Sequence, residues 1–156
     1  MRRINRAKDK EATIRALTKD KDEEKESPKF SIFPTMWQLL IFAAMLGYKK
    51  GRKEPLEKID NGKSINAELF MKDPCFEGML NLFSLMDEEN ERLLTTNPEN
   101  NERKLALFEE YANGGLAILK EELETSNFSL ESVITLIADG LHTEQQLDED
   151  LNTIQI

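Results

Sequence analysis

The sequence predicts a mainly α-helical protein, a compact bundle of four to five helices with a short extended segment near residues 56–72. Two observations lead to this fold class. Apolar residues recur every three or four positions in several separate segments, which is the spacing of one face of a helix. Proline, glycine and asparagine, which favour turns, separate these segments. A chain of 156 residues is also long enough to bury an apolar core in one domain.

The N-terminal residues 1–29 are expected to form a charged arm and linker ahead of a single helical domain, residues 30–142. A thin apolar stripe favours a short helix over residues 9–19. The run from residue 20 to residue 28 consists mainly of Asp, Glu and Lys, so it has little to bury and is typical of a solvated linker.

Residues 34–50 give the clearest helix pattern in the chain. Their apolar side chains fall on two faces, so this helix belongs at the centre of the fold. Pro34 suits the first turn of a helix, and Gly51 is a natural terminator. Basic residues around Gly51 complement the negative end of the helix dipole.

The segment that follows, residues 54–72, contains the turn signal Asp60-Asn61-Gly62. A short hairpin, an extended linker and a short helix all fit this segment, and the sequence does not select one of them. After it, Asp73-Pro74 supplies an N-cap followed by proline at the first helical position. This pair predicts a helix over residues 74–94.

Asn97-Pro98 ends that pattern, and Asn100 or Asn101 is expected to cap a helix over residues 102–125. Gly114-Gly115 lies inside this helix, where each glycine costs about 1 kcal/mol relative to alanine. The two glycines therefore predict either the close crossing of another helix or a kink.

The last helix is expected over residues 129–141, with Ser129 as its N-cap and Gly140 near its end. Residues 143–156 are acidic and polar without a sustained pattern, so they are expected to be a disordered tail.

Charge is divided unevenly along the chain. Residues 1–63 hold 16 Lys and Arg and 10 Asp and Glu, whereas residues 64–156 hold 5 and 20, so the two parts carry +6 and −15 within a net charge of −9. A net negative protein is repelled by nucleic acid as a whole. Any DNA contact would therefore come from the basic N-terminal part and weaken as salt rises.

Cys75 is the only cysteine, which excludes an internal disulfide and a cysteine-only zinc site and fits a reducing cytoplasm. The longest apolar run, Leu39 to Leu46, has eight residues, whereas a membrane-spanning helix needs about 20. The basic N-terminus is not followed by the apolar stretch of a secretory signal. We therefore expect a cytoplasmic protein that does not cross a membrane.

Standard catalytic constellations are missing from the sequence. His142 is the only histidine, and Cys75 is expected as a small core residue because no general base can be assigned to it. Paired carboxylates such as Glu109-Glu110 are expected on solvated helix faces, since adjacent helical residues point about 100° apart. No phosphate-binding loop of the Gly-x-x-x-x-Gly-Lys type is present. We expect no enzyme activity, no cofactor and no metal site.

Two basic clusters are candidates for contact with a partner protein or with nucleic acid. The first follows the central helix and consists of Lys49, Lys50, Arg52 and Lys53. The second lies within residues 2–10, on an arm expected to be flexible. Cations at a helix C-terminus can hold a phosphate backbone or an acidic protein surface, and helix capping accounts for part of the first cluster.

Two stretches carry patterns that are not generic to helices. Residues 37–56 read WQLLIFAAMLGYKKGRKEPL, and residues 107–119 read LFEEYANGGLAIL. Both stretches resemble segments of the small proteins associated with Dnd systems, which perform DNA phosphorothioation in bacteria and accompany restriction partners in defence clusters. The similarity covers residues 1–140, with a looser match between the two stretches.

This resemblance implies an accessory role in a phosphorothioation-dependent defence or restriction system, as a subunit that binds larger ATPase or nuclease components. It brings no catalytic residue with it. Docking would use the first basic cluster or the helix-packing residues Tyr111, Gly114 and Gly115. The alternative is a module that binds the DNA backbone through the basic clusters at 2–10 and 49–53. The weakest hypothesis is a nuclease-like enzyme that uses Glu54, Glu57 and Lys58.

Overall fold

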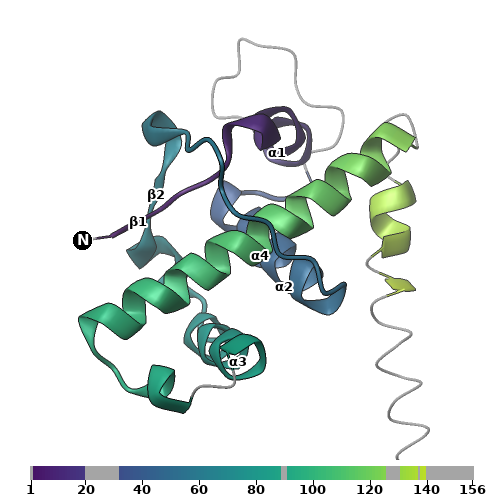
Figure 1. The fold of residues 1–156 in the computed structure, drawn as a ribbon. Helices are drawn as coiled ribbons and strands as arrows, with labels where there is room; N and C mark the ends of the chain where they lie inside the picture. The colour runs from purple at the N-terminus through teal and green to yellow at the C-terminus, as the bar shows by residue number, and fades with distance from the viewer. Residues whose placement is uncertain (1, 20–31, 89–90, 126–130, 137, 140–156) are drawn as a thin grey trace, which may run out of the picture. The chain divides into compact units, whose positions relative to one another are not determined.

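A computed structural model describes residues 2–19, 32–88, 91–125, 131–136 and 138–139 (Figure 1). The chain forms two compact units, Met1–Ile118 and Leu119–Ile156. The described residues are mainly helical, with two short strands, so the predicted fold class is confirmed. Among the helices of these described residues, none has both the length and the apolar character required to cross a bilayer.

The N-terminal residues are part of the first unit. Strand β1 (Arg3–Ile4) pairs antiparallel with β2 (Ile65–Asn66), so that Ile4 lies opposite Ile65. A 3-10 turn, η1 (Lys8–Lys10), leads into α1 (Glu11–Leu17), where a helix was predicted. Ile4 is 1% exposed and Ala7 is 2% exposed. The prediction of a flexible arm at residues 2–10 is therefore wrong, because its apolar side chains are buried in the core.

Helix α2 (Met36–Lys49) is the predicted central helix. It ends in a Schellman motif, since the Arg52 N–H donates to the Gly47 carbonyl at 2.8 Å and the Gly51 N–H to the Tyr48 carbonyl at 3.1 Å. Gly51 has a φ of 64°, a left-handed conformation that glycine adopts without a steric penalty. The predicted terminator at Gly51 is confirmed.

The sequence of residues 54–72 fitted a hairpin, an extended linker or a short helix, and the structure combines the last two. This segment contains a 3-10 turn, η2 (Asn61–Lys63), the short strand β2, and a second 3-10 helix, η3 (Ala67–Lys72). Strand β2 pairs with β1 and not with a neighbour in its own segment, so no local hairpin forms. Strand β2 is the short extended segment that the sequence allows near residues 56–72.

Helix α3 (Phe76–Glu88) and the 3-10 turn η4 (Glu91–Leu94) occupy the segment predicted as one helix. Helix α4 (Pro98–Thr125) begins earlier than predicted. Asn97 caps it, because its Oδ1 accepts the Asn100 N–H at 2.8 Å. The predicted cap at Asn100 or Asn101 is therefore wrong. Asn100 instead donates its amide to carbonyls of the preceding turn.

Residues 131–136 and 138–139, in the second unit, are helical, as predicted for this stretch. The predicted cap Ser129, Gly140 and the tail at residues 143–156 lie outside the described residues. The same holds for the linker predicted at residues 20–28.

An aromatic cluster fills the core of the first unit. Phe70, Phe76 and Phe108 are fully buried, and their ring centroids lie 5.2 to 5.5 Å apart. Phe83 continues the cluster to Tyr111, whose ring centroid is 4.8 Å away. Edge-to-face and tilted ring pairs at these distances are favourable because the positive ring edge meets the negative face of its neighbour. The cluster joins η3, α3 and α4.

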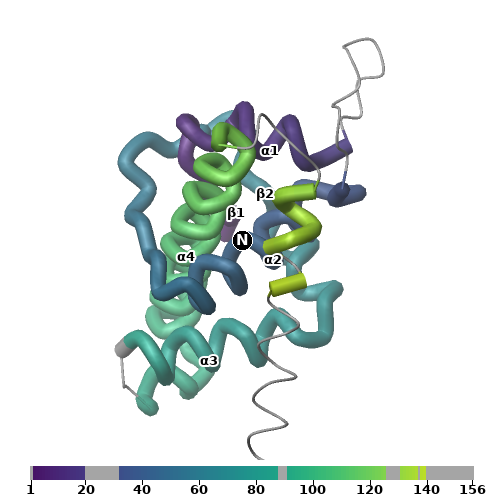
Figure 2. Tube along the Cα trace, turned by 90° about the vertical axis from the view of Figure 1, so that its right-hand side faces the viewer, coloured from purple at the N-terminus to yellow at the C-terminus, as the bar shows by residue number. Residues whose placement is uncertain are grey.

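Helix α2 lies against the middle of α4, as Figures 1 and 2 both show. The two backbones touch: a Cβ atom built on Gly115 would lie 1.8 Å from the Ala43 carbonyl oxygen, and one built on Gly47 would lie 2.2 Å from the Tyr111 carbonyl oxygen. Only glycine fits at such distances. The close helix crossing predicted from Gly114-Gly115 is confirmed.

We predict that Gly115→Ala destabilises the protein by about 3 kcal/mol or more, because backbone atoms of α2 cannot move away from the added methyl group without separating the helices. Denaturant unfolding followed by circular dichroism measures the change. Gly78→Ala is the matched control, since Gly78 lies in α3 and an added Cβ there would meet nothing within 4 Å. This control should gain up to about 1 kcal/mol from helix propensity. Equal stability of the two variants would contradict the crossing.

Candidate functional site

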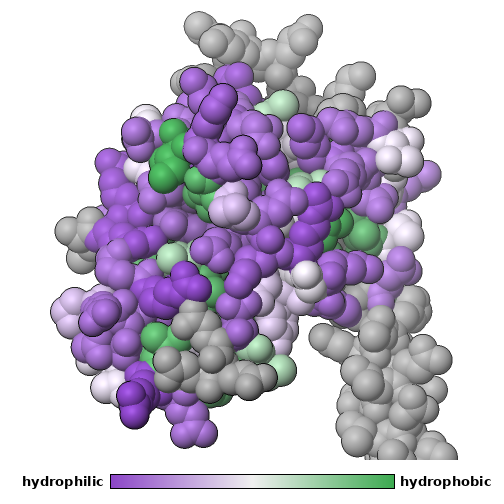
Figure 3. Space-filling model, in the orientation of Figure 1, coloured by the Kyte–Doolittle hydropathy of each residue, from purple (hydrophilic) through white to green (hydrophobic). Residues whose placement is uncertain are grey.

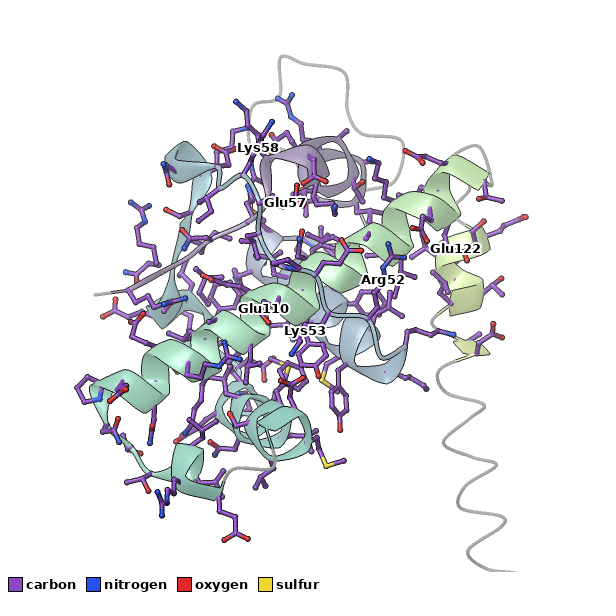
Figure 4. The ribbon with its side chains drawn as sticks, viewed as in Figure 1. Arg52, Lys53, Glu57, Lys58, Glu110 and Glu122 are labelled. Atoms are coloured by element: carbon purple, nitrogen blue, oxygen red, sulfur yellow. The ribbon has the colours of Figure 1, made fainter. Side chains whose placement is uncertain are left out.

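The first basic cluster forms the turn that ends α2, and we call it the basic turn: Lys49, Lys50, Arg52 and Lys53. The Schellman motif reverses the chain here, so the four side chains leave from a tight bend and from the extended segment after it. Arg52 is partly buried, whereas Lys53 and the two lysines at the end of the helix, Lys49 and Lys50, are exposed. Figure 4 shows Arg52 and Lys53 on the segment that runs beside α4.

Lys53 is held by carboxylates from two helices. Its Nζ lies 2.8 Å from both carboxylate oxygens of Asp87 on α3, and 3.9 Å from Glu110 on α4. The Tyr111 hydroxyl donates to Asp87 at 2.9 Å. Burial alone would raise the pKa of Asp87, but the hydrogen bonds from Lys53 and Tyr111 outweigh it and hold that pKa below its ordinary value. Burial and the Asp87 carboxylate raise the pKa of Tyr111 to about 12.

The segment after the basic turn is fastened along α4 by its backbone. The Glu54 N–H donates to the Glu110 carbonyl at 3.0 Å, and the Asn113 side-chain amide donates to the Pro55 carbonyl at 3.1 Å. Arg52 and Glu54 form an ion pair at 2.7 Å on the outer side of this segment. The basic turn is therefore fixed in place by α4 and is not a free loop.

The second basic cluster also binds carboxylates of its own chain. Arg2 bonds Glu102 and lies 3.0 Å from Glu109, both on α4. The Asn5 N–H donates to Glu109 at 2.7 Å. Glu109 is thus buried, and its predicted place on a solvated helix face is wrong. Burial raises the pKa of Glu109, although Asn5 and Arg2 both favour its charged form.

Arg6 and Lys10, further along the same cluster, are buried as well. Arg6 bonds Glu11 and lies 3.5 Å from Asp60, and Lys10 lies 2.7 Å from Asp9. Residues of both clusters therefore form ion pairs with carboxylates of the same chain. These pairs lower the positive charge that could attract a phosphate backbone.

Tyr111, Gly114 and Gly115 are buried. A Cβ on Gly114 would lie 2.1 Å from the Arg52 carbonyl oxygen, so α4 meets the segment after α2 there and α2 itself at Gly115. The three residues hold the fold together, and their surfaces are covered by the chain's own elements.

An exposed apolar strip, which the sequence patterns did not single out, runs over α2 and α3. It consists of Met45, Leu82, Leu85 and Met86, of which Met86 is the most exposed at 62%. Met45 and Leu82 also line a cavity of about 300 Å³ between the two helices. On the face drawn in Figure 3, hydrophilic side chains predominate and apolar ones form separate patches.

Cys75 lines the same cavity and is exposed, so its prediction as a core residue is wrong. The cause is local: the Cys75 N–H donates to the Asp73 carboxylate at 2.8 Å, which places Cys75 in the turn before α3 and leaves Phe76 as the first buried residue of that helix.

Glu54, Glu57 and Lys58, the residues of the nuclease-like hypothesis, line one cavity of about 400 Å³ together with Lys10 and Asn113. Figure 4 shows Glu57 and Lys58 on the extended segment that follows the basic turn. Within the described residues, no group of three or more Asp, Glu, His or Cys side chains is placed to hold a metal ion. His142 lies outside these residues.

The sequence profile of the family described as "DNA sulphur modification system-associated protein 4" matches residues 3–155. The chain belongs to this family. Membership confirms the resemblance to Dnd-associated proteins. Searches among curated proteins and among solved structures gave no match.

In this member of the sulphur modification-associated family, the two stretches that carried the resemblance meet in space. Ala43 and Gly47 from the first stretch contact Gly115 and Tyr111 from the second. Asn113 from the second binds the carbonyl of Pro55 from the first. The two stretches on which the resemblance rests therefore build the contact between α2, the basic turn and α4.

We predict that Tyr111→Phe destabilises the protein by about 1 to 2 kcal/mol, because it removes a hydrogen bond to a carboxylate and keeps the ring in the aromatic cluster. Tyr48→Phe is the matched control, since the Tyr48 ring packs in the same cluster 5.7 Å from that of Tyr111. Urea unfolding of both variants gives the comparison, and a larger loss for Tyr48→Phe would contradict the role of the hydroxyl.

Asp87 should also make stability depend on pH. Its folded pKa lies below the ordinary value of 3.8, so its charged form contributes stability above about pH 4, and this contribution is lost as pH falls through the folded pKa. Asp87→Asn should therefore lower stability at neutral pH and flatten the decline in acid. Unfolding free energies measured between about pH 2 and pH 7 test this, and parallel curves for the variant and the original protein would refute it.

Proposed function

We propose that this protein is a non-catalytic accessory subunit of a bacterial DNA phosphorothioation-dependent defence or restriction system, in which it binds larger protein components. The family match over residues 3–155 carries the proposal. The structure supports it because the residues of the two stretches that resemble the family pack the helices together and hold the basic turn. The protein would work in the cytoplasm, where that DNA is found, and would need no cofactor.

The surface that best suits a protein partner combines the apolar strip with the basic turn. Leu82, Leu85 and Met86 lie three and four residues apart on one face of α3, and Met45 joins them from α2. Lys49 lies one helical turn beyond Met45, and Lys53 reaches Asp87, the neighbour of Met86. Apolar side chains exposed in this way are typical of docking surfaces.

The chemistry of this surface defines its partner. The apolar strip removes apolar surface of the partner from water, and the exposed Lys50 near its end favours carboxylates at the rim of the contact. We therefore expect a component of the same system that presents an apolar face bordered by Asp or Glu.

Co-purification tests the proposal directly. The tagged chain, co-expressed with the other proteins of its native Dnd gene cluster, should retain one of them through a wash in moderate salt. Met86→Glu should weaken this association about tenfold or more, because it puts a charge into the apolar contact. Lys50→Glu should act more weakly, through the rim.

Lys72→Glu is the matched control for these variants, since Lys72 is exposed on η3 and belongs to neither part of the surface. Thermal unfolding of each variant checks that the fold is kept. Recovery of the chain without any of those proteins would count against an accessory role, and equal loss in Lys72→Glu would remove this surface from it.

Direct binding to the DNA backbone through the clusters at 2–10 and 49–53 is the alternative, and the ion pairs of Arg2, Arg6, Lys10 and Lys53 disfavour it. Affinity for duplex DNA at two salt concentrations separates the two functions. Salt-sensitive binding that Lys50→Ala with Arg52→Ala abolishes would replace the partner-docking proposal with DNA binding.

A further inference from the structure

The apolar strip of the first unit carries both a protruding side chain and a hollow. Met86 protrudes furthest into solvent, since 62% of its surface is exposed. The hollow is the cavity of about 300 Å³ between α2 and α3, and Met45, Gly78 and Leu82 are among the residues that line it. Gly78, Leu82 and Met86 are spaced four residues apart, so they follow one another along the same side of α3. A surface that contains both a knob and a hole can bind a copy of itself about a twofold axis.

Contacts within the described part of the chain do not explain why residue 78 is a glycine. Gly78 lies inside α3, where glycine costs about 1 kcal/mol relative to alanine. A Cβ atom built on Gly78 would meet nothing within 4 Å, whereas one built on Gly47 or Gly115 would collide with backbone atoms. Gly78 is also exposed. A glycine on an exposed apolar face leaves room for a group that approaches from outside the chain.

A twofold axis at Leu82 brings the knob and the hole together. In an antiparallel pair of α3 helices, residues at equal distances from the axis face each other, and Gly78 and Met86 are each four residues from Leu82. Met86 of each copy therefore faces the cavity beside Gly78 of the other copy, about 6 Å along the helix from the axis. The two copies of Leu82 meet at the centre of the contact.

Charges at the two ends of the strip fit the same antiparallel arrangement. The end of α2 lies beside the second half of α3, since the ring centroids of Tyr48 and Phe83 are 5.1 Å apart. Lys50, which follows directly after α2 and is exposed, is therefore at the C-terminal end of the strip. Asp73 lines the cavity at the other end, just before α3. Antiparallel pairing brings Lys50 of one copy toward Asp73 of the other, whereas parallel pairing would bring like charges together.

We propose that the free protein forms a twofold dimer through the apolar strip, with the α3 helices antiparallel and Met86 of each copy in the cavity between α2 and α3 of the other. The strip is small beside a standard protein interface, which takes about 20 to 30 residues from each side. The dissociation constant should therefore lie at about 1 to 100 µM. The dimer needs no other protein, so it does not depend on the proposed function, but a partner that docks on the strip has to displace the second copy.

The oligomeric state of the purified full-length chain is the first test. Analytical ultracentrifugation between about 1 µM and 1 mM should show a reversible equilibrium between monomer and dimer. A monomer throughout this range overturns the dimer and leaves the result of the co-purification experiment unaffected. A dimer that retains no protein of the Dnd cluster supports the present proposal and counts only against the accessory role.

Gly78→Gln should weaken the dimer about tenfold or more, because the added side chain fills the space that receives Met86. The monomer should keep its fold, since an added Cβ at Gly78 meets nothing within 4 Å, and thermal unfolding at low concentration checks this. Glu77→Gln is the matched control: it places the same side chain at the next residue, about 100° around α3 from Gly78, and should leave the dimer unchanged. Equal dimer affinity of the two variants overturns the proposed contact.

Disulfide cross-linking locates the twofold axis. Cys75 is the only cysteine, so Cys75→Ser provides a chain without thiols into which Leu82→Cys is introduced. Mild oxidation should link two copies of this variant, because a residue on the axis meets its own copy. Leu85→Cys in the same background is the control: Leu85 is also exposed on the strip, but it faces Met79 of the second copy and should cross-link much more slowly. Equal cross-linking of the two variants overturns the antiparallel arrangement.

Discussion

The direct contact between the backbones of α2 and α4 is the constraint on which the rest of the structure depends. Gly47 and Gly115 let the two helices approach until carbonyl oxygens occupy the space of absent side chains. At any larger separation, the Glu54 N–H would lose the Glu110 carbonyl and the Asn113 amide would lose the carbonyl of Pro55. The glycines, which weaken α4 as an isolated helix, are thus required for its tertiary contacts.

The fold also brings oppositely charged parts of the chain together. The sequence separates a basic N-terminal part from an acidic remainder, and the fold brings the two together: Arg2 lies against Glu109, and Lys53 against Asp87. Such ion pairs contribute little to stability where they are exposed. At partly buried positions they provide each charge with a partner of opposite sign, which an isolated buried charge would lack. At these positions, basic residues of the N-terminal part and acidic residues of the remainder therefore serve contacts within the fold.

Periodicity in the sequence was enough to predict α1, α2, α3 and α4, because each buries an apolar stripe. The cap of α4 was missed because Asn97, Asn100 and Asn101 have nearly the same intrinsic preference, and only the hydrogen bond to Asn97 distinguishes them. The packing of residues 2–10 could not be predicted, since β1 pairs with a strand that is distant in the sequence, at Ile65–Asn66. Of the candidate site, the basic residues were found by composition, but their carboxylate partners depend on tertiary contacts.

The pairing of β1 with β2 also bears on how the chain is made. Residues that are synthesised earlier are held by residues that are synthesised much later: Arg3 pairs with Asn66, and the Asn5 N–H donates to Glu109, which is 104 positions further on. Long-range contacts of this kind form slowly because a large loop must close first. During synthesis, Ile4 therefore stays exposed until α4 has emerged, and nascent-chain chaperones have time to bind the segment around it.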